Sequence, residues 1–255
     1  MINRKYKLFL AVSMAILVMA SCGAPSAPAE SPDEAPPAEQ PAPTEAPAMD
    51  MGACSNPFLP VEEGKTYVYN QIEGGTTTEY TITYTDVSSS GFTQMIEEDD
   101  QSVSVEWNCT ENGLVPGEFF EADFIQIEGM EFDVETTEVS GHFLPPANEW
   151  EVGNSWDLAY TVTVNVSAEG LETSVEGSMD LKNTIAAQES VTVPAGTYDN
   201  AYRVEQTGTF NASFMGMESG SSMEQTYWFV RDVGLIRNVV GIQGAEYSLE
   251  LVSVE

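Results

Sequence analysis

Apolar and polar side chains alternate along most of the chain from Lys65 onward. The clearest run places six large apolar residues at every second position: Trp156, Leu158, Tyr160, Val162, Val164 and Val166. A period of two residues is that of a β-strand with one side buried and the other facing water. The same period predicts further strands at Tyr80–Tyr84, Val103–Trp107, Phe119–Ile127, Met130–Val139, Thr173–Ile185, Tyr198–Phe210, Glu224–Val230, Leu235–Val240 and Tyr247–Val252.

Turn-forming residues separate these runs. They are Gly74-Gly75, Ser88–Gly91, Asn112-Gly113, Pro194–Gly196 and Gly220–Ser222. Short links of this kind favour hairpins and leave no room for crossover helices. Within this region no stretch carries apolar residues at the 3.6-residue period of an amphipathic helix. The sequence therefore predicts an all-β, antiparallel fold.

Two similar motifs lie 89 residues apart, measured between their glycines. The first runs from Phe58-Leu59-Pro60 to Gly64-Lys65-Thr66-Tyr67, and the second from Phe143-Leu144-Pro145 to Gly153-Asn154-Ser155-Trp156. They indicate either two similar β units, at about 54–140 and 141–255, or two unrelated strands that each follow a turn.

The start of the chain has the pattern of a secretory signal. Arg4, Lys5 and Lys7 precede an apolar stretch, Leu8–Ala20, that is too short to span a bilayer. The end of this stretch and the next two residues, Met19-Ala20-Ser21-Cys22, resemble the cleavage motif of bacterial lipoproteins. That resemblance implies removal of residues 1–21 and attachment of lipid to Cys22, which would anchor the protein to a membrane. The alternative is a plain secretory signal.

Residues 22–52 are rich in Ala, Pro, Glu and Ser and contain no aromatic residue. Such a composition buries too little apolar surface to fold, so we expect a disordered tether before an all-β domain at 53–255. Cleavage before Cys22 would leave five basic residues against 41 acidic ones, a net charge of −36. This charge excludes nucleic acid and anionic lipid headgroups as specific ligands and favours a solubilising acidic surface.

If Cys22 carries lipid, Cys54 and Cys109 remain. Two cysteines in an oxidising compartment favour a disulfide, and free thiols are the alternative in a reducing envelope. A metal site needs more ligands than these cysteines and a single histidine provide.

Candidates for chemistry are few. His142, the chain's single histidine, follows Ser140-Gly141 in a predicted turn, without a nucleophile motif nearby. Four adjacent carboxylates, Glu97, Glu98, Asp99 and Asp100, are weak candidates for binding calcium. The spacing of a calcium-binding loop is missing, so a solvated hairpin tip explains them better. We therefore expect no catalytic residue, no cofactor and no enzymatic activity.

Aromatic residues on the predicted strands suggest a groove for an apolar ligand, because a curved sheet gathers alternate side chains on its concave face. The candidates are Tyr67, Tyr69, Trp107, Trp156, Tyr160 and Trp228. The alternative is that they form the core. Trp228 lies between Tyr227 and Phe229, so it faces the side of the sheet opposite to both neighbours.

Several segments resemble a broad group of uncharacterised bacterial envelope lipoproteins. They are Asn56-Pro57-Phe58, Val193–Tyr198, Tyr202-Arg203-Val204, Tyr227-Trp228-Phe229 and Val233–Arg237. The resemblance implies a curved antiparallel sheet like the half-barrels of lipoprotein carriers. A half-barrel or a sandwich-like arrangement of this sheet is therefore expected. We expect a membrane-anchored extracytoplasmic lipoprotein that acts as a non-catalytic binding or structural module. A half-barrel carrier of an apolar ligand is the first alternative, and an envelope enzyme is the second.

Overall fold

The computed structural model describes residues 52–98, 101–118, 130–168, 171–214, 217–242 and 245–255. The predicted signal, Cys22, nearly all of the tether, Asp99, Asp100 and the predicted strand Phe119–Ile127 lie outside these ranges. All described residues belong to one compact unit, Ala48–Glu255.

The described residues of this unit form twelve strands. They are β1 (Thr66–Glu73), β2 (Thr76–Thr85), β3 (Gly91–Glu98), β4 (Gln101–Thr110), β5 (Gly113–Pro116), β6 (Met130–Gly141), β7 (Ser155–Ala168), β8 (Leu171–Val193), β9 (Gly196–Phe214), β10 (Met217–Val230), β11 (Gly234–Ile242) and β12 (Ala245–Val254). Within the same ranges, two single-turn 3-10 helices, η1 (Gly52–Cys54) and η3 (Ala147–Glu149), accompany them. Among the described residues, no helix has the length and apolar content needed to cross a membrane.

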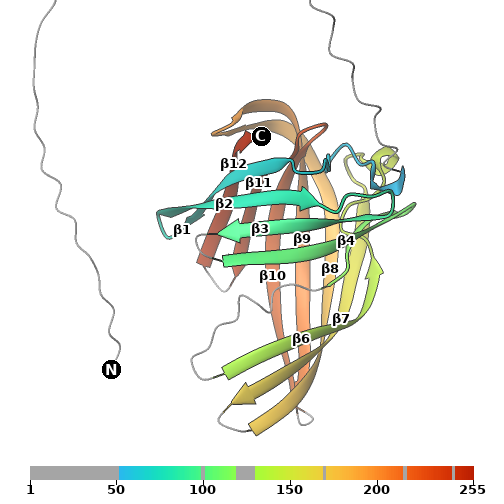
Figure 1. The fold of residues 1–255 in the computed structure, drawn as a ribbon, viewed down its shortest axis with the longest axis vertical. Coiled ribbons are helices and arrows are strands. Elements are labelled where there is room, and N and C mark those ends of the chain that lie inside the picture. The colour runs from blue at the N-terminus through green and yellow to red at the C-terminus, as the bar shows by residue number, and fades with distance from the viewer. Residues whose placement is uncertain (1–51, 99–100, 119–129, 169–170, 215–216, 243–244) are drawn as a thin grey trace, which may run out of the picture. The chain divides into compact units, whose positions relative to one another are not determined.

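All twelve strands belong to one antiparallel sheet, in the order β5-β4-β3-β2-β1-β12-β11-β10-β9-β8-β7-β6. Most neighbours are joined by hairpins, and four of the five predicted turns lie between strands. The predicted turn at Gly220–Ser222 is wrong, because these residues lie within β10 and pair with β9. The exception is β12, which pairs with β11 on one side and with β1 on the other, where Tyr67 lies opposite Val254. The structure confirms the predicted all-β, antiparallel, curved sheet, and the single sheet matches a half-barrel rather than a sandwich (Figure 1).

Strands β5 and β6 follow one another in sequence but form opposite edges of the sheet. The two edges meet where Leu114 on β5 forms an isolated bridge with Leu144, just after β6. The Leu114 N–H donates to the Leu144 carbonyl at 3.0 Å, and the Phe143 N–H donates to the Leu114 carbonyl at 2.8 Å. We call this contact the seam. At the seam, the two edges of the sheet are hydrogen-bonded to each other near one end of β5 and one end of β6.

The β8–β9 hairpin is the longest in the sheet and bends over one end of it (Figure 1). Register shifts between Ile185 and Ala187 and between Glu189 and Val191 account for the bend, because a bulge increases local twist. At the hairpin tip, the Ala195 N–H donates to the Leu251 carbonyl of β12 at 2.9 Å. The hairpin tip thus reaches back to β12 at this end of the sheet.

The buried apolar residues form two clusters. The main apolar cluster is rich in aromatic rings and draws on nearly every strand together with Phe58, Leu144 and Trp150. The second apolar cluster is smaller and consists of Leu158, Tyr160, Val162, Met179 and Leu181 on β7 and β8. The predicted core positions are therefore confirmed as buried, but they divide into two groups.

The two similar sequence motifs fold in the same local way. The Gly64 N–H donates to the Tyr84 carbonyl, and the Gly153 N–H donates to the Ile185 carbonyl, both at 2.8 Å. A second pair of matching contacts joins the hydroxyls at the start of each hairpin, Thr66 to Thr83 and Ser155 to Thr184. These contacts are those of two equivalent turn-and-strand units; the division into two β units stays a prediction.

Candidate functional site

Five of the six aromatic groove candidates lie in the core. Tyr67, Tyr69, Trp107, Trp156 and Tyr160 are each at most 7% exposed. Their polar atoms bond inside the domain: the Tyr69 hydroxyl donates to the Leu235 carbonyl at 2.9 Å, and the Trp107 indole N–H donates to Gln94 at 2.7 Å. Burial, followed by the neighbouring phenols, raises the pKa of Tyr69 well above its ordinary value.

Rings in the main apolar cluster pack directly on one another. Phe92 stacks on Trp107 with centroids 5.5 Å apart, and Trp107 meets Phe143 edge to face at 5.5 Å. Phe58 stacks on Trp150 at 3.7 Å, the shortest of the described ring contacts. Offset and edge-to-face contacts of this kind stabilise a core beyond the area they bury. Tyr67, Trp107 and Trp156 therefore act as packing partners of other rings here.

Trp228 lies on the opposite face from these residues. Its neighbours Tyr227 and Phe229 are buried in the main apolar cluster, whereas Trp228 is half-buried. Its cross-strand partners are two arginines, Arg203 on β9 and Arg237 on β11. The Arg237 guanidinium lies over the indole ring at 5.2 Å. Trp228 still packs against the main apolar cluster, although it is not among the fully buried rings.

The two arginines beside Trp228 both form ion pairs with nearby carboxylates. The indole N–H donates to Glu189 at 2.7 Å, and Arg203 pairs with Glu189 and Glu205. Arg237 pairs with Glu250 on β12 at 3.5 Å. Two of the few basic residues in the domain are therefore held by their own carboxylates, so this outer cluster presents no excess positive charge.

A row of side-chain amides crosses the inner face between the two apolar clusters. Asn183 on β8 pairs in register with Gln206 on β9, and Gln206 pairs with Gln225 on β10. We call these three residues the amide row. Asn183 and Gln206 are only 1% and 2% exposed. Buried amides are costly unless they form hydrogen bonds, so this row needs partners.

Hydrogen bonds join Asn183 to Gln206 within the amide row, and they join the row to Tyr227 and Asn238. Gln206 Nε2 donates to Asn183 Oδ1 at 2.8 Å, and the Tyr227 hydroxyl donates to Gln206 Oε1 at 3.4 Å. Gln225 Nε2 donates to Asn238 Oδ1 at 3.1 Å, and Asn238 Nδ2 donates to the Thr226 carbonyl. Asn183 Nδ2 is the exception, because it has no hydrogen-bond partner among the described residues.

The amide row marks the border between the clusters on each strand. Along β8 the inward residues are Leu181 of the second cluster, then Asn183, then Ile185 of the main cluster. On β10 the corresponding residues are Met223, Gln225 and Tyr227. The amide row was not predicted from the sequence, although a signal was present: each amide occupies a position that the two-residue period assigns to the buried side.

His142 lies at the seam, and no catalytic partner contacts it among the described residues. Its ring stacks on Trp156 with centroids 6.1 Å apart, and its Nε2 is buried with no hydrogen-bond partner in this part of the chain. Burial lowers the pKa of His142, while the nearby Glu149 carboxylate opposes that shift in part. The neutral imidazole is therefore favoured, which suits a packing role beside Trp156.

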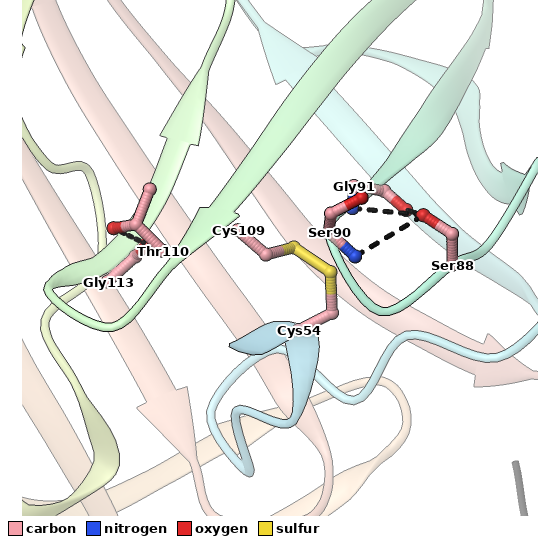
Figure 2. The surroundings of a disulfide bond; sticks show 7 residues. All are labelled: Cys54, Ser88, Ser90, Gly91, Cys109, Thr110 and Gly113. Carbon is pink, nitrogen blue, oxygen red and sulfur yellow. Dashed lines mark hydrogen bonds between the residues drawn. A yellow bond between two sulfur atoms is a disulfide. The ribbon is translucent and has the colours of Figure 1, made fainter. Parts of the chain in front are cut away.

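Cys54 and Cys109 form the predicted disulfide, which ties η1 to β4 (Figure 2). Their Cα atoms are 5.0 Å apart, and both residues are buried. Beside the bridge, the Ser88 hydroxyl donates to the Gly91 carbonyl and accepts the Gly91 N–H, closing the β2–β3 turn. The bridge thus fixes the start of the domain to the sheet.

The structure describes two of the four residues in the predicted carboxylate cluster. Glu97 and Glu98 are successive residues of β3, so their side chains point to opposite faces of the sheet. Glu98 Oε1 accepts a hydrogen bond from Gln71 Nε2 at 2.8 Å, whereas Glu97 is exposed. Asp99 and Asp100 lie outside the described residues. Within the described ranges, His, Cys, Asp and Glu form no group of three suited to holding a metal ion.

Comparison with known proteins finds similarity only among solved structures. No family model matches the chain, and no curated protein is similar to it. A proposed exported protein with a YmcC-like fold from Bacteroides fragilis is 13% identical, with a TM-score of 0.46 over 78% of this chain and 98% of its own.

Two further structures are similar at the same level or below. A proposed lipoprotein from Parabacteroides distasonis is 12% identical, with a TM-score of 0.46 over 78% of this chain and 99% of its own. The hypothetical lipoprotein YmcC from Escherichia coli is 10% identical, with a TM-score of 0.33 over 76% of this chain and 87% of its own. Such low scores support no argument about function.

Proposed function

We propose that this protein is a bacterial lipoprotein, anchored outside the cytoplasm by lipid on Cys22, whose β domain is a non-catalytic binding or structural module. The observation that carries the proposal is the Cys54–Cys109 bridge, because it pairs the other two of the chain's three cysteines. A disulfide of this kind persists in oxidising compartments. The remaining cysteine stands at the end of the signal-like motif Met19–Cys22.

The first residues of the domain support a tethered arrangement. Phe58 is fully buried between Trp150 and Tyr202, and the Arg231 guanidinium lies 5.1 Å from its ring centroid. The Asn56 side-chain amide donates to the Pro145 carbonyl at 3.0 Å, and its Oδ1 accepts the Phe58 N–H. Together with the disulfide, these contacts fix the point at which a tether of residues 22–52 would join the sheet.

Replacement of Cys22 tests the anchor. The Cys22→Ser protein should leave the membrane fraction and enter the aqueous phase in a detergent-partition assay. The Cys54→Ser/Cys109→Ser variant is the matched control, since it also loses thiols but keeps Cys22, and it should stay with the membrane. Unchanged retention of Cys22→Ser would contradict lipid anchoring.

A second candidate function is that of a half-barrel carrier for an apolar ligand or lipid. One observation favours it: the inner face combines the second apolar cluster with a buried row of amides. Sites for small ligands are commonly apolar with a few placed polar groups, and a polar row in an otherwise apolar interior fits that description.

A further inference from the structure

His142 is part of the seam between the two edges of the sheet. On one side its side chain lies against β5, because a Cβ built on Gly113 would lie 3.2 Å from the histidine Cβ and Cγ. On another side its ring stacks on Trp156 of β7. Since β5 is one edge of the sheet and β7 pairs with the other edge, β6, this side chain contacts both sides of the seam.

Trp156 connects the His142 ring to the backbone of the seam. The indole N–H of Trp156 donates to the Phe143 carbonyl at 3.1 Å, and the Phe143 N–H donates to the Leu114 carbonyl at 2.8 Å. The backbone N–H of His142 donates to the Asp157 carbonyl at 3.3 Å. Movement of the ring would therefore disturb Trp156 and, through it, the few bonds that hold the seam.

The position of one ring nitrogen makes the closed seam unfavourable for a protonated histidine. Nε2 of His142 is buried, and no described residue forms a hydrogen bond with it. A neutral imidazole carries a proton on one nitrogen, whereas an imidazolium carries an N–H on both. A buried N–H of a charged ring is costly without an acceptor, so the closed seam and a protonated His142 disfavour each other. Burial lowers the pKa of His142, in agreement with this geometry.

The charged groups on the elements around the ring do not supply that acceptor. Glu149 on η3 is the carboxylate that acts on His142, and it favours the protonated form. Glu111 lies exposed in the β4–β5 turn, and Asp157 on β7 lies opposite Lys182 on β8. None of these carboxylates bonds to Nε2. A protonated ring therefore gains an acceptor for this nitrogen only if it leaves its buried position.

We propose that His142 is a pH-sensitive switch that controls the seam. The neutral ring stays between Gly113 and Trp156 and keeps the two edges together. When the ring takes up a proton from solvent, it leaves this position, and the backbone bonds between Leu114 and Leu144 open. The ordinary pKa of histidine is about 6.5, so the seam is closed above this pH and opens more often as the pH falls below it. This property goes beyond the proposed anchoring and binding roles and makes the domain responsive to the pH outside the cytoplasm.

Amide hydrogen exchange measures how often the seam opens. The full chain carrying Cys22→Ser is followed by NMR at pH 7.5 and pH 5.5, and each rate is divided by that of an unstructured peptide at the same pH. We expect the protection of the Leu114 and Phe143 amides to fall about fivefold to tenfold between the two conditions. The Val204 amide on β9, a strand paired on both sides, should keep its protection.

Two variants test the histidine itself. His142→Phe keeps a flat ring that can stack on Trp156 but cannot take up a proton, so its seam amides should have the same protection at both pH values. Glu111→Gln removes an exposed carboxylate of the β4–β5 turn and keeps His142, so it should show the same fall as the parent. Near-ultraviolet circular dichroism checks that both variants are folded.

Three results would overturn the inference: unchanged protection of Leu114 and Phe143 in the parent, an equal fall at Val204, or the same fall in His142→Phe as in the parent. An equal fall at Val204 would mean that the whole domain opens rather than the seam. The comparison of amides within the parent needs no variant, so it holds even if His142→Phe does not fold. None of these results bears on the Cys22 anchor, which the partition assay tests separately.

Discussion

Leu114 and Leu144 join the two opposite edges of a twelve-stranded sheet through a hydrogen bond of 3.0 Å between their backbones. Leu114 lies in β5, and Leu144 follows β6. These two strands are consecutive in sequence and nevertheless lie eleven places apart in the strand order. The seam is short, because β5 has only four residues. Its few bonds should therefore be sensitive to single substitutions.

Gly113 is the residue of the seam with the least room. A Cβ at this position would lie 2.2 Å from the Leu144 carbonyl oxygen, and the backbone φ of +129° is itself unfavourable for other residues. We expect Gly113→Ala to lower the free energy of unfolding by about 2–4 kcal/mol, measured by urea denaturation, because the clash separates the two edges.

Gly64→Ala is the matched control for this substitution. Gly64 also has a positive φ, +76°, but no atom lies within 4 Å of a Cβ built there. Its substitution should cost about 1 kcal/mol through backbone strain alone. If the two variants were equally stable, close packing at the seam would not be the cause of the Gly113 effect.

The disulfide should contribute strongly to stability. The bridge closes a loop with a sequence separation of 55 residues, for which the chain-entropy model gives about 4 kcal/mol. Cys54→Ser/Cys109→Ser should lose about that amount in urea denaturation under non-reducing conditions. Adding a reductant during unfolding should bring the parent protein to the level of the variant. A parent protein with two alkylatable thiols in its native form would contradict the bridge.

His142 predicts a specific loss of stability in mild acid. Burial lowers its pKa in the folded protein, so the folded state binds this proton less readily than the unfolded state. The contribution of the neutral ring is complete above the ordinary pKa of about 6.5 and decreases as the pH falls below it. The parent should therefore lose stability relative to His142→Gln between pH 7.5 and pH 5, measured as the difference in urea midpoints.

Carboxylates affect both proteins in that comparison equally, so the difference between them isolates the histidine. Parallel pH profiles for the parent and His142→Gln would show that protonation of this ring is not linked to unfolding. Recovery of a normal histidine pKa by NMR titration of the folded protein would contradict the prediction independently.

The buried phenols should resist ionisation until the domain unfolds. Burial raises the pKa of Tyr69, Tyr84 and Tyr160 well above the ordinary value of about 10. Their neutral forms stabilise the fold fully below that value, and this contribution decreases as the pH rises above it. An ultraviolet titration should show a delayed fraction of tyrosines that ionises together with loss of near-ultraviolet dichroism. Smooth ionisation of every tyrosine near pH 10 would contradict this expectation.

Alternation along the chain was sufficient to predict most strands and the buried side of each. For example, Trp156, Leu158 and Tyr160 are all buried, as the two-residue period required. Most of the turn residues also located hairpins, because glycines at positive φ such as Gly74 and Gly75 leave few alternatives, whereas Gly220–Ser222 lie inside β10. The disulfide followed from the number of cysteines and from the expected compartment.

Long-range relationships were beyond the reach of local patterns. Trp150 was missed, since it follows the irregular η3 segment and gains its role from Phe58, 92 positions earlier in the chain. The amide row was missed because each amide is an isolated exception on its own strand. Only the register that places Asn183 beside Gln206 turns these exceptions into one feature.

The pairing of β1 with β12 has a kinetic consequence. The hairpins β1–β5 and β6–β12 connect residues that are close in sequence, so each run can form through rapid local steps. The bonds between Thr66 and Glu255, at 2.8 and 3.0 Å, instead bring together positions nearly the whole domain apart. We expect this union of two preformed halves to limit the rate of folding, and the protein to reach its native state slowly.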